Sequence, residues 1–451
     1  MRVLLISTYE MGRQPFGLAS PTAWLRAAGF DVVCIDLSQQ PLNRSVSEAQ
    51  LIGFYLPMHT ATRIAAGAIR KIRQVNPAAQ LCAFGLYAPL NAEHLRGLGV
   101  AHILGGEFES SLVELARAIA TGNVSPRTDT SLERLSFHVP DRTCLPALDK
   151  YAKLRLPDGT RRVVGYTEAS RGCKHLCRHC PIVPVYEGKF RVVAREVVLG
   201  DIRQQVEAGA RHITFGDPDF FNGVGHGMEI VRRLHREFPA LSFDATIKVE
   251  HLLQHAGHLR ELRDCGCAFV TSAVESVDDR MLRLLDKGHT RADFYRVAQL
   301  FRDAGLVLSP TFVAFTPWTT LRGYADLLNV IEELQLVEHV APVQLAIRLL
   351  IPAGSRLLEL PQVRKLVGSF DSAALTFPWK HREARVDELQ RRISDAVQAL
   401  GENADRRAAF AHARDLLRRA RAGEEIAAPL PEVPPAPARV TIPYLTEPWY
   451  C

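Results

Sequence analysis

Apolar and polar positions alternate in two patterns over the first 121 residues. Short apolar runs, typical of buried strands, fall at residues 3–6, 31–35, 51–56, 80–84 and 101–104. The segments between them show the apolar spacing of helices, with Ser20-Pro21 as one predicted helix start and Gly29 as its end. Strands that alternate with helices across short turns predict a doubly wound parallel sheet, whose ligands bind beyond the carboxyl ends of the strands.

The alternation resumes after residue 162. Strands are expected near residues 163–168, 211–216, 241–247, 268–275, 307–315 and 343–350. Helices are expected at residues 196–208, 228–237, 252–265, 278–285, 291–304 and 323–334. Six strand–helix units in succession predict a second α/β domain. Because active residues of α/β barrels lie at the carboxyl ends of the strands, candidate chemistry is expected there.

The remaining segments lack this alternation. Residues 122–162 are rich in turn formers, and Leu156-Pro-Asp-Gly-Thr160 predicts a hairpin that leads into the second domain. Apolar residues at helical spacing follow at 382–422, and then a proline-rich stretch at 427–437. We therefore expect five regions: a doubly wound domain at 1–121, a connector at 122–162, a barrel core at 163–360, a helical region at 361–426, and a proline-rich linker and tail at 427–451.

Composition excludes several classes of protein. The 451 residues are 47% apolar and 23% charged, as in ordinary globular proteins. The 55 Lys and Arg residues outnumber the 49 Asp and Glu residues by only 6, a charge that fits anionic small ligands as well as RNA and does not by itself argue for nucleic acid, so nucleic acid is not an expected partner. No apolar run approaches about 18 residues, which predicts no membrane span. The apolar start is too short for a signal sequence, so we expect the nine cysteines to be reduced in the cytoplasm.

Three cysteines carry the most specific chemistry in the sequence. Cys173, Cys177 and Cys180 form a C-x-x-x-C-x-x-C run. Three thiolates are one short of the four ligands of a closed zinc site or an ordinary iron–sulfur cluster, which leaves one metal position open. The alternative is a zinc site completed by a histidine of the same loop, His175 or His179. With a zinc site of this kind, the chain would be a zinc-stabilised RNA-binding protein.

The cysteine spacing is the signature of the radical SAM superfamily, and the chain resembles that family. The resemblance implies a partial (β/α)₆ barrel, a [4Fe–4S] cluster on the three cysteines, and S-adenosylmethionine (SAM) bound to the open iron. One electron from a donor such as flavodoxin or ferredoxin then cleaves SAM and releases a 5′-deoxyadenosyl radical. His179 matches the ring residue that precedes the last cysteine in the family. Arg171, Lys174 and Arg178 either attract an acidic electron donor or are merely exposed.

The resemblance also assigns residues at the strand ends to SAM. Gly216, Asp217 and Asp219 occupy the place of a G-G-E-like motif that grips the ammonium group, although the sequence departs from that motif. A helix-capping turn is the alternative there. Glu275 and Ser276 match a V-E-S segment, followed by Lys287-Gly-His-Thr290, that binds the ribose hydroxyls. Lys248 meets the SAM carboxylate or is solvated. Cys267 matches a structural position, and Cys265 has no expected role.

The first domain resembles the Rossmann-like cobalamin-binding domain that precedes the barrel in B12-dependent members. The loops after three strands correspond to those that hold the corrin and its nucleotide tail, with candidates at Met58, His59, Gly85, Gly106 and Glu107. The D-x-H-x-x-G motif of other cobalamin proteins is absent. A flavodoxin-like lid without a cofactor is the alternative. Among the other cysteines we expect core thiols at Cys34 and Cys82 and an inert, isolated thiol at Cys144.

The last ten residues resemble a radical SAM group named for a Cys-Sec-Ala-Glu-Pro or Cys-Cys-Ala-Glu-Pro tail. This sequence stops at the first cysteine of that tail, which predicts a UGA codon read as stop and makes Cys451 a candidate for substrate or redox chemistry. The family implies a monomeric enzyme that performs cobalamin-dependent C-methylation of a small molecule. The alternatives are a radical SAM rearrangement or thiol-linked reaction without methyl transfer, and a zinc-stabilised RNA-binding protein.

Overall fold

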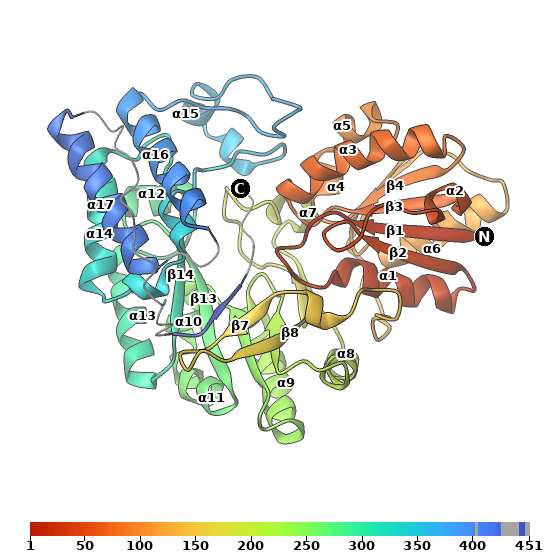
Figure 1. Cartoon of the computed structure of the whole chain (residues 1–451), viewed down its shortest axis with the longest axis horizontal. Helices are drawn as coiled ribbons and strands as arrows, with labels where there is room; N and C mark the ends of the chain where they lie inside the picture. The colour runs from red at the N-terminus through yellow and green to blue at the C-terminus, as the bar shows by residue number, and fades with distance from the viewer. Residues whose placement is uncertain (402–404, 425–441, 447–451) are drawn as a thin grey trace.

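The computed structural model describes residues 1–401, 405–424 and 442–446. Its N-terminal part contains six parallel strands in the order β2-β1-β3-β4-β5-β6 (Figure 1). These strands are β1 (Arg2–Ser7), β2 (Asp31–Asp36), β3 (Leu51–Tyr55), β4 (Gln80–Phe84), β5 (His102–Gly106) and β6 (Arg127–Ser131). All five strands expected from apolar runs are confirmed. β6 was missed and lies in the expected connector, because an edge strand is free to be polar and shows no apolar run.

Helices cover both faces of this sheet. They are α1 (Phe16–Ala27), α2 (Ser45–Glu48), α3 (His59–Val75), α4 (Tyr87–Leu90), α5 (Ala92–Gly97) and α6 (Glu109–Ala120). The predicted helix start at Ser20-Pro21 is wrong, because α1 begins earlier, at Phe16, and buries Leu18 and Leu25 in the core. Pro21 leaves one carbonyl of the helix without its usual N–H donor, a cost that the apolar burial offsets. The hydroxyl of Ser20 donates to Glu109 instead of capping the helix.

A disulfide joins Cys34 of β2 to Cys144 of the segment that follows β6. The expectation of a core thiol and an isolated thiol is therefore wrong for this pair. Polar contacts hold the segment against α1: Arg26 pairs with Asp141 at 2.6 Å, and the Asp141 N–H donates to the Ala19 carbonyl. These contacts bring together two cysteines that are 110 positions apart.

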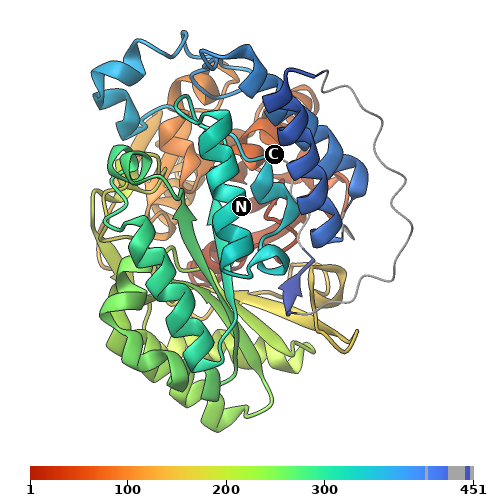
Figure 2. The same ribbon diagram turned by 90° about the vertical axis from the view of Figure 1, so that its left-hand side faces the viewer.

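The second sheet has the strand order β14-β13-β12-β11-β8-β7-β15. Its members are β7 (Lys153–Arg155), β8 (Arg161–Thr167), β11 (His212–Phe215), β12 (Ser242–Thr246), β13 (Cys267–Glu275), β14 (Leu308–Phe312) and β15 (Tyr444–Leu445). The five strands from β8 to β14 are parallel and match the expected barrel strands. The predicted hairpin before them is confirmed, since the Leu156 N–H donates to the Thr160 carbonyl. β7 and β15 extend the sheet at its other edge (Figure 2).

The sixth expected barrel strand, at 343–350, is wrong. The chain forms η5 (Pro342–Leu345) there and makes one parallel bridge, between Phe315 and Arg348. Side chains use the backbone acceptors on both sides of that bridge. The hydroxyl of Tyr324 donates to the Leu345 carbonyl, and the indole N–H of Trp379 donates to the Leu349 carbonyl. A longer strand ladder would compete for these carbonyls.

Six expected helical segments surround the barrel. They correspond to α8 (Arg195–Glu207), α9 (Val224–Glu237), α10 (Val249–Gln254) with η3 (Ala256–His258) and α11 (Leu259–Asp264), α12 (Asp279–Leu285), α13 (Arg291–Ala304) and α14 (Leu321–Glu333). The third segment is interrupted at Gly257, a poor helix former. Shorter elements are η1 (Leu148–Lys150), β9 (Ser170–Gly172), α7 (Val183–Tyr186), β10 (Phe190–Val192), η2 (Phe220–Gly223), η4 (Val337–His339) and η6 (Arg356–Glu359).

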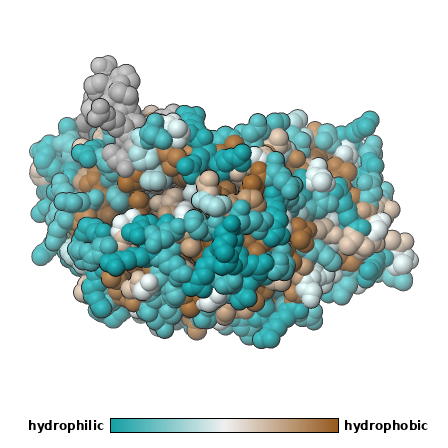
Figure 3. Space-filling view, turned by 90° about the horizontal axis from the view of Figure 1, so that it is seen from below, coloured by the Kyte–Doolittle hydropathy of each residue, from teal (hydrophilic) through white to brown (hydrophobic). Residues whose placement is uncertain are grey.

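The C-terminal region is helical mainly in its second half. α15 (Pro361–Arg364) is one short turn, whereas α16 (Ala384–Leu400) and α17 (Arg406–Ala422) pack against each other, and α17 also packs against α14 (Figures 1 and 2). The expectation of a helical region from 361 onward is therefore only partly right. No helix in the described residues is long and apolar enough to cross a membrane. Hydrophilic residues cover most of the face shown in Figure 3, with apolar residues between them. The expected linker and Cys451 lie outside the described residues.

Candidate active site

The cysteine motif forms the loop between β9 and α7. Cys177 is buried, and the backbone N–H of Cys180 donates to its carbonyl. Burial raises the pKa of Cys180 to about 12, and the Cys177 and Cys173 thiolates add to that rise.

Asn222 of η2 holds the start of the cysteine loop, and sequence reasoning missed it. Its side-chain oxygen accepts from the Lys174 N–H at 3.2 Å and lies 3.8 Å from the Cys173 sulfur. The Asn222 amide N–H₂ donates to the Gly172 carbonyl at 3.5 Å. These contacts fix the first cysteine relative to the strand ends of the barrel. The signal in the sequence was the position of Asn222 in the turn after the second barrel strand.

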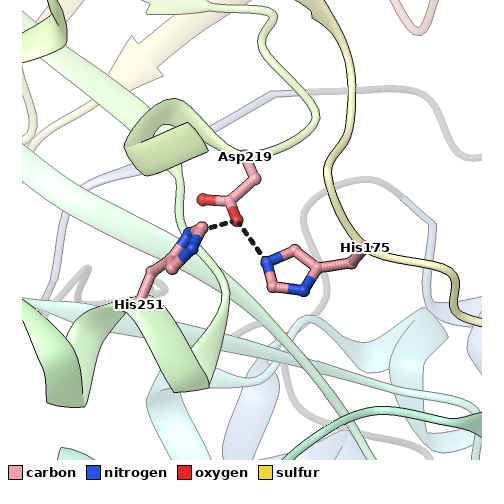
Figure 4. A group of neighbouring side chains, drawn as sticks. All are labelled: His175, Asp219 and His251. Atoms are coloured by element: carbon pink, nitrogen blue, oxygen red, sulfur yellow. Dashed lines mark ion pairs between the residues drawn. The ribbon is translucent and has the colours of Figure 1, made fainter. Parts of the chain in front are cut away.

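A polar clamp, made of His175, Asp219 and His251, joins the middle of the loop to the barrel (Figure 4). Asp219 Oδ2 lies 2.7 Å from His251 Nδ1 and 3.6 Å from His175 Nε2. Burial alone would raise the pKa of Asp219, but the two histidines lower it to about 2. Lys248 lies 2.9 Å from His175 Nδ1 and 3.0 Å from Glu250. Lysine has no acceptor, so His175 Nδ1 accepts and the ring proton of a neutral His175 faces Asp219.

Asp217 supports the segment that leads into the cysteine loop. Its buried carboxylate accepts from the Ala169 N–H at 2.9 Å and from the Ser170 hydroxyl at 2.5 Å. Burial raises the pKa of Asp217 to about 7, against the lowering effect of these two hydrogen bonds. Gly216 precedes it because the Tyr166 ring lies across its Cα, where a Cβ would come within 1.9 Å of the phenol oxygen. Both residues line a cavity inside the barrel.

We expect Asp217 to make stability depend on pH near neutrality. Its folded pKa of about 7 exceeds the ordinary value of 3.8, so its contribution is complete at low pH and is lost as pH rises through 7. Between pH 5.5 and 8 the loss is on the order of 2 kcal/mol. Scanning calorimetry of anaerobic protein should show the wild-type melting temperature falling relative to Asp217→Asn over this range. Asp141→Asn is the control, because the pKa of Asp141 is lowered and lies below the range. Parallel curves for wild type and Asp217→Asn would contradict this prediction.

Glu275 ends β13 in a strained conformation, with a backbone φ of 65°. Its buried carboxylate lies 3.1 Å from His179 Nε2 and 3.4 Å from Lys287 Nζ. Burial would raise the pKa of Glu275, but Lys287 and His179 lower it to about 2. The structure thus brings together two residues expected from the sequence and adds Lys287, which was missed as a site residue. The Ser276 hydroxyl accepts from the Asp278 N–H and turns the chain into α12.

Glu275→Gln is expected to weaken SAM binding by about tenfold or more. A carboxylate accepts from both hydroxyls of a ribose, whereas the amide has one acceptor, and hydrogen bonds to charged groups contribute about 1.5–3 kcal/mol. Equilibrium dialysis of SAM with reconstituted protein measures the dissociation constant. Glu261→Gln is the matched control, because Glu261 pairs with Arg232 far from the loop, on α11. An unchanged dissociation constant in Glu275→Gln would exclude the ribose role.

Comparison with known proteins decides the class of this site. The sequence model of the radical SAM superfamily matches residues 167–319, which include the three cysteines and Glu275. These residues form a radical SAM domain. It binds SAM and a [4Fe–4S] cluster, and the three thiols supply the expected donor set. The chain therefore contains a radical SAM domain at residues 167–319.

Curated relatives match the radical SAM domain and part of its surroundings. A tRNA-2-methylthio-N(6)-dimethylallyladenosine synthase from Jannaschia sp. is 24% identical over 59% of this chain and 57% of its own length. A hopanoid C-3 methylase from Methylococcus capsulatus is 25% identical over 41% of this chain and 35% of its own length. The matches thus span less than two thirds of these relatives.

Solved structures share the whole architecture. The cobalamin-dependent radical SAM enzyme OxsB, with aqua-cobalamin bound, aligns over 93% of this chain and 73% of its own, with a TM-score of 0.73 and 14% identity. The radical SAM methyltransferase TsrM from Kitasatospora setae, with cobalamin and a [4Fe–4S] cluster bound, aligns over 73% of this chain and 70% of its own, with a TM-score of 0.55 and 17% identity. At these identities the likeness confirms the fold: a doubly wound domain joined to a radical SAM barrel.

The candidate cobalamin residues lie at the carboxyl edge of the first sheet, which faces the radical SAM domain (Figure 1). His59 Nε2 lies 2.6 Å from the Ala374 carbonyl, and Met58 packs on the core beside it. Gly85 has a φ of 103° and lies against the Tyr55 ring. Gly106 has a φ of 64° and touches the Ser131 carbonyl of β6. The close approaches that require these two glycines are therefore to the protein itself.

A buried ion network joins the two domains beside this edge. Arg171 of β9 lies 3.4 Å from Glu107, 2.7 Å from Glu109 and 2.7 Å from Glu168. Glu107 also accepts from the Tyr186 hydroxyl, and burial raises the pKa of Glu107 to about 7. The expectation that Arg171 faces an electron donor is wrong, because its side chain is buried among acids. Lys174 is exposed on the cysteine loop, and Arg178 donates to carbonyls of α12.

Proposed function

We propose that this radical SAM enzyme binds cobalamin and methylates a carbon atom of a small molecule. The observation that carries the proposal is the shared architecture with OxsB over 93% of the chain, including the doubly wound domain. When bound, the cluster and SAM supply hydrogen-atom abstraction, and cobalamin supplies methyl transfer. The hopanoid C-3 methylase among the relatives is a C-methylating enzyme by name and supports the same reaction class.

We propose two binding sites, one at the carboxyl ends of the barrel strands and one at the carboxyl edge of the first sheet. At the barrel, Cys173, Cys177 and Cys180 hold the cluster, and Glu275 and Ser276 are proposed to bind the ribose of SAM. Gly216, Asp217 and Asp219 are proposed to bind its ammonium group, and Lys248 its carboxylate. The clamp and Asp217 also hold the loop, so these acids serve two roles. We also propose that the Cys451 thiol takes part in substrate or redox chemistry. Measurement of product formation by Cys451→Ala protein tests this role.

The edge of the first sheet offers a place for cobalamin. The loops after β3, β4 and β5 converge there, and the Ser7 hydroxyl at the end of β1 is buried without a hydrogen-bond partner among the described residues. A buried polar group of this kind is expected to meet a ligand or water. Met58, His59, Gly85, Gly106 and Glu107 are the proposed contacts.

A second candidate function is a radical SAM reaction without methyl transfer, supported by the methylthio-forming relative. The N-terminal domain would then act as a lid. The first 121 residues lack a second cysteine trio of the kind that would hold another cluster, which favours methylation over methylthio transfer. The match to the radical SAM model disfavours the zinc-stabilised RNA-binding role, because a radical SAM domain uses its cysteines for a [4Fe–4S] cluster.

Anaerobic purification from cells fed with cobalamin separates the two functions. We expect about one corrin per chain in the absorption spectrum and, after reduction with SAM, both 5′-deoxyadenosine and S-adenosylhomocysteine. Methyl-deuterated SAM should place its label in the product. Retention of the cluster without a corrin spectrum, with 5′-deoxyadenosine as the one SAM product, would defeat methylation and favour the rearrangement.

A further inference from the structure

A cavity of about 270 Å³ lies inside the barrel, beside Gly216 and Asp217. Four parts of the chain build its wall: the barrel strands, the loop after β1 with Met11 and Arg13, the η5 segment with Ala341 and Gln344, and the C-terminal elements α17 and β15. Segments far apart in the sequence therefore line the cavity. Its volume is at the small end of ligand sites and suits a small molecule.

One row of hydroxyl groups crosses the cavity wall. Thr246 of β12 pairs in register with Thr271 of β13, which pairs with Ser309 of β14. None of these hydroxyls forms a side-chain hydrogen bond with another residue in the described part of the chain. Interiors of α/β barrels are commonly filled by branched apolar side chains. A row of free hydroxyls in their place is suited to a polar molecule.

Arg406, at the start of α17, brings a positive charge to the wall of the same cavity. Its guanidinium donates to the Glu338 carbonyl at 2.5 Å and lies 4.5 Å from the centre of the Tyr444 ring. No carboxylate lies within 4.0 Å of it among the described residues, because the Glu338 carboxylate pairs with the neighbouring Arg407. Burial lowers the pKa of Arg406 to about 10, although Tyr444 and Glu338 act to raise it. A desolvated cation without a direct ion pair favours a bound anion.

The acids on the wall do not neutralise Arg406. Asp244 accepts from Thr214 at 2.6 Å and lies 2.9 Å from His212 Nε2. Asp217 accepts from the segment before the cysteine loop, as described above. Tyr444 lies between Arg406 and Arg155 of β7, so β15 holds the ring that packs on the guanidinium. The charge and the hydroxyl row therefore belong to the wall of one cavity.

We propose that this cavity binds the substrate of the radical SAM reaction, and that the substrate is a small hydroxylated molecule with one carboxylate or phosphate group held by Arg406. The hydroxyl row binds the polar body of the molecule, and the cavity reaches Asp217 beside the cysteine loop. This inference rests on the proposed function for its place in the reaction. The binding step itself is independent of cobalamin.

Three matched three-carbon probes test the proposal: glycerol, glycerate and glycerol 3-phosphate. Isothermal titration calorimetry is performed anaerobically on the cluster-loaded full chain. At least one anion is expected to bind about tenfold or more tightly than glycerol, since a charge-assisted hydrogen bond to arginine has that effect. Preference for glycerate or for glycerol 3-phosphate distinguishes a carboxylate from a phosphate substrate.

Variants identify the cation. Arg406→Gln should abolish the preference for the anion, and Arg406→Lys should retain part of it. Arg418→Gln is the matched control, because Arg418 lies on the same helix, is exposed and pairs with Asp415. Equal binding of the three probes, no anion binding up to 50 mM (roughly the limit of a useful site), or an equal loss in Arg418→Gln overturns the proposal. Circular dichroism confirms that each variant is folded. A wild-type protein that prefers anions but makes no 5′-deoxyadenosine refutes the proposed function and leaves anion binding standing.

Discussion

Cys177→Ala protein, reconstituted anaerobically with iron and sulfide, is expected to release no 5′-deoxyadenosine above background when it is reduced with SAM. Cys177 is the buried member of the three thiols, and no cysteine beyond these three lies on the same loop in the described residues. Removal of a residue that only contacts a metal ligand lowers metal affinity or activity by about 10–100-fold, so removal of a ligand itself should lower them further. Chromatography of the quenched reaction measures the nucleoside, and elemental analysis measures iron and sulfide.

Cys265→Ala is the matched control for this loss. Cys265 is also buried, but it caps α11 and has no expected contact with the cluster. We expect its iron, sulfide and 5′-deoxyadenosine to equal those of the wild type. Wild-type protein that binds one zinc ion and little iron, or Cys177→Ala protein that keeps full SAM cleavage, would refute the cluster assignment. Measurement of metal content separates this result from misfolding, which also lowers activity.

Elements with local signals at both ends could be predicted from the sequence to the residue. α13 begins after Thr290, whose side chain forms a reciprocal capping box with Asp293, and it ends before Gly305, which has a φ of 66°. Both signals act within one helical turn, so no tertiary information is needed. The cysteine motif is similarly local. His179, which was expected from this motif, lies 3.1 Å from Glu275 in the structure.

Features that depend on distant partners were missed. The sixth barrel strand fails because Tyr324 and Trp379 occupy backbone acceptors, and neither contact has a signal within 343–350. His251 joins the site only because the barrel brings the ends of different strands together. In the sequence, Arg171 is one of three basic residues around the cysteine loop. Its partners Glu107 and Glu109 belong to another domain, so nothing near Arg171 in the sequence indicates them. Such long-range pairs have no periodicity that a single sequence reveals.

Arg171→Met is expected to lower the free energy of unfolding by about 3–5 kcal/mol, because it leaves buried carboxylates without their cation. Arg171 contacts Glu107, Glu109 and Glu168, and its guanidinium also lies 4.8 Å from the centre of the Phe137 ring. Methionine keeps the apolar length of the side chain and removes the charge. Denaturant unfolding under anaerobic conditions measures the loss. Arg203→Met is the control, since the exposed pair of Arg203 with Glu237 should contribute less than about 1 kcal/mol.

The sign of the pH dependence distinguishes lost charge from lost packing. Without Arg171 the pKa values of Glu107 and Glu168, which burial already raises, should rise further. A raised carboxyl pKa stabilises the fold at low pH, and this contribution is lost as pH rises through the folded pKa. The Arg171→Met deficit should therefore be smaller at pH 5.5 than at pH 8, and adding Glu109→Gln and Glu168→Gln should recover part of it at pH 8. A deficit that is equal at both pH values and unchanged by the glutamine substitutions would show that Arg171 stabilises the domain contact by packing alone.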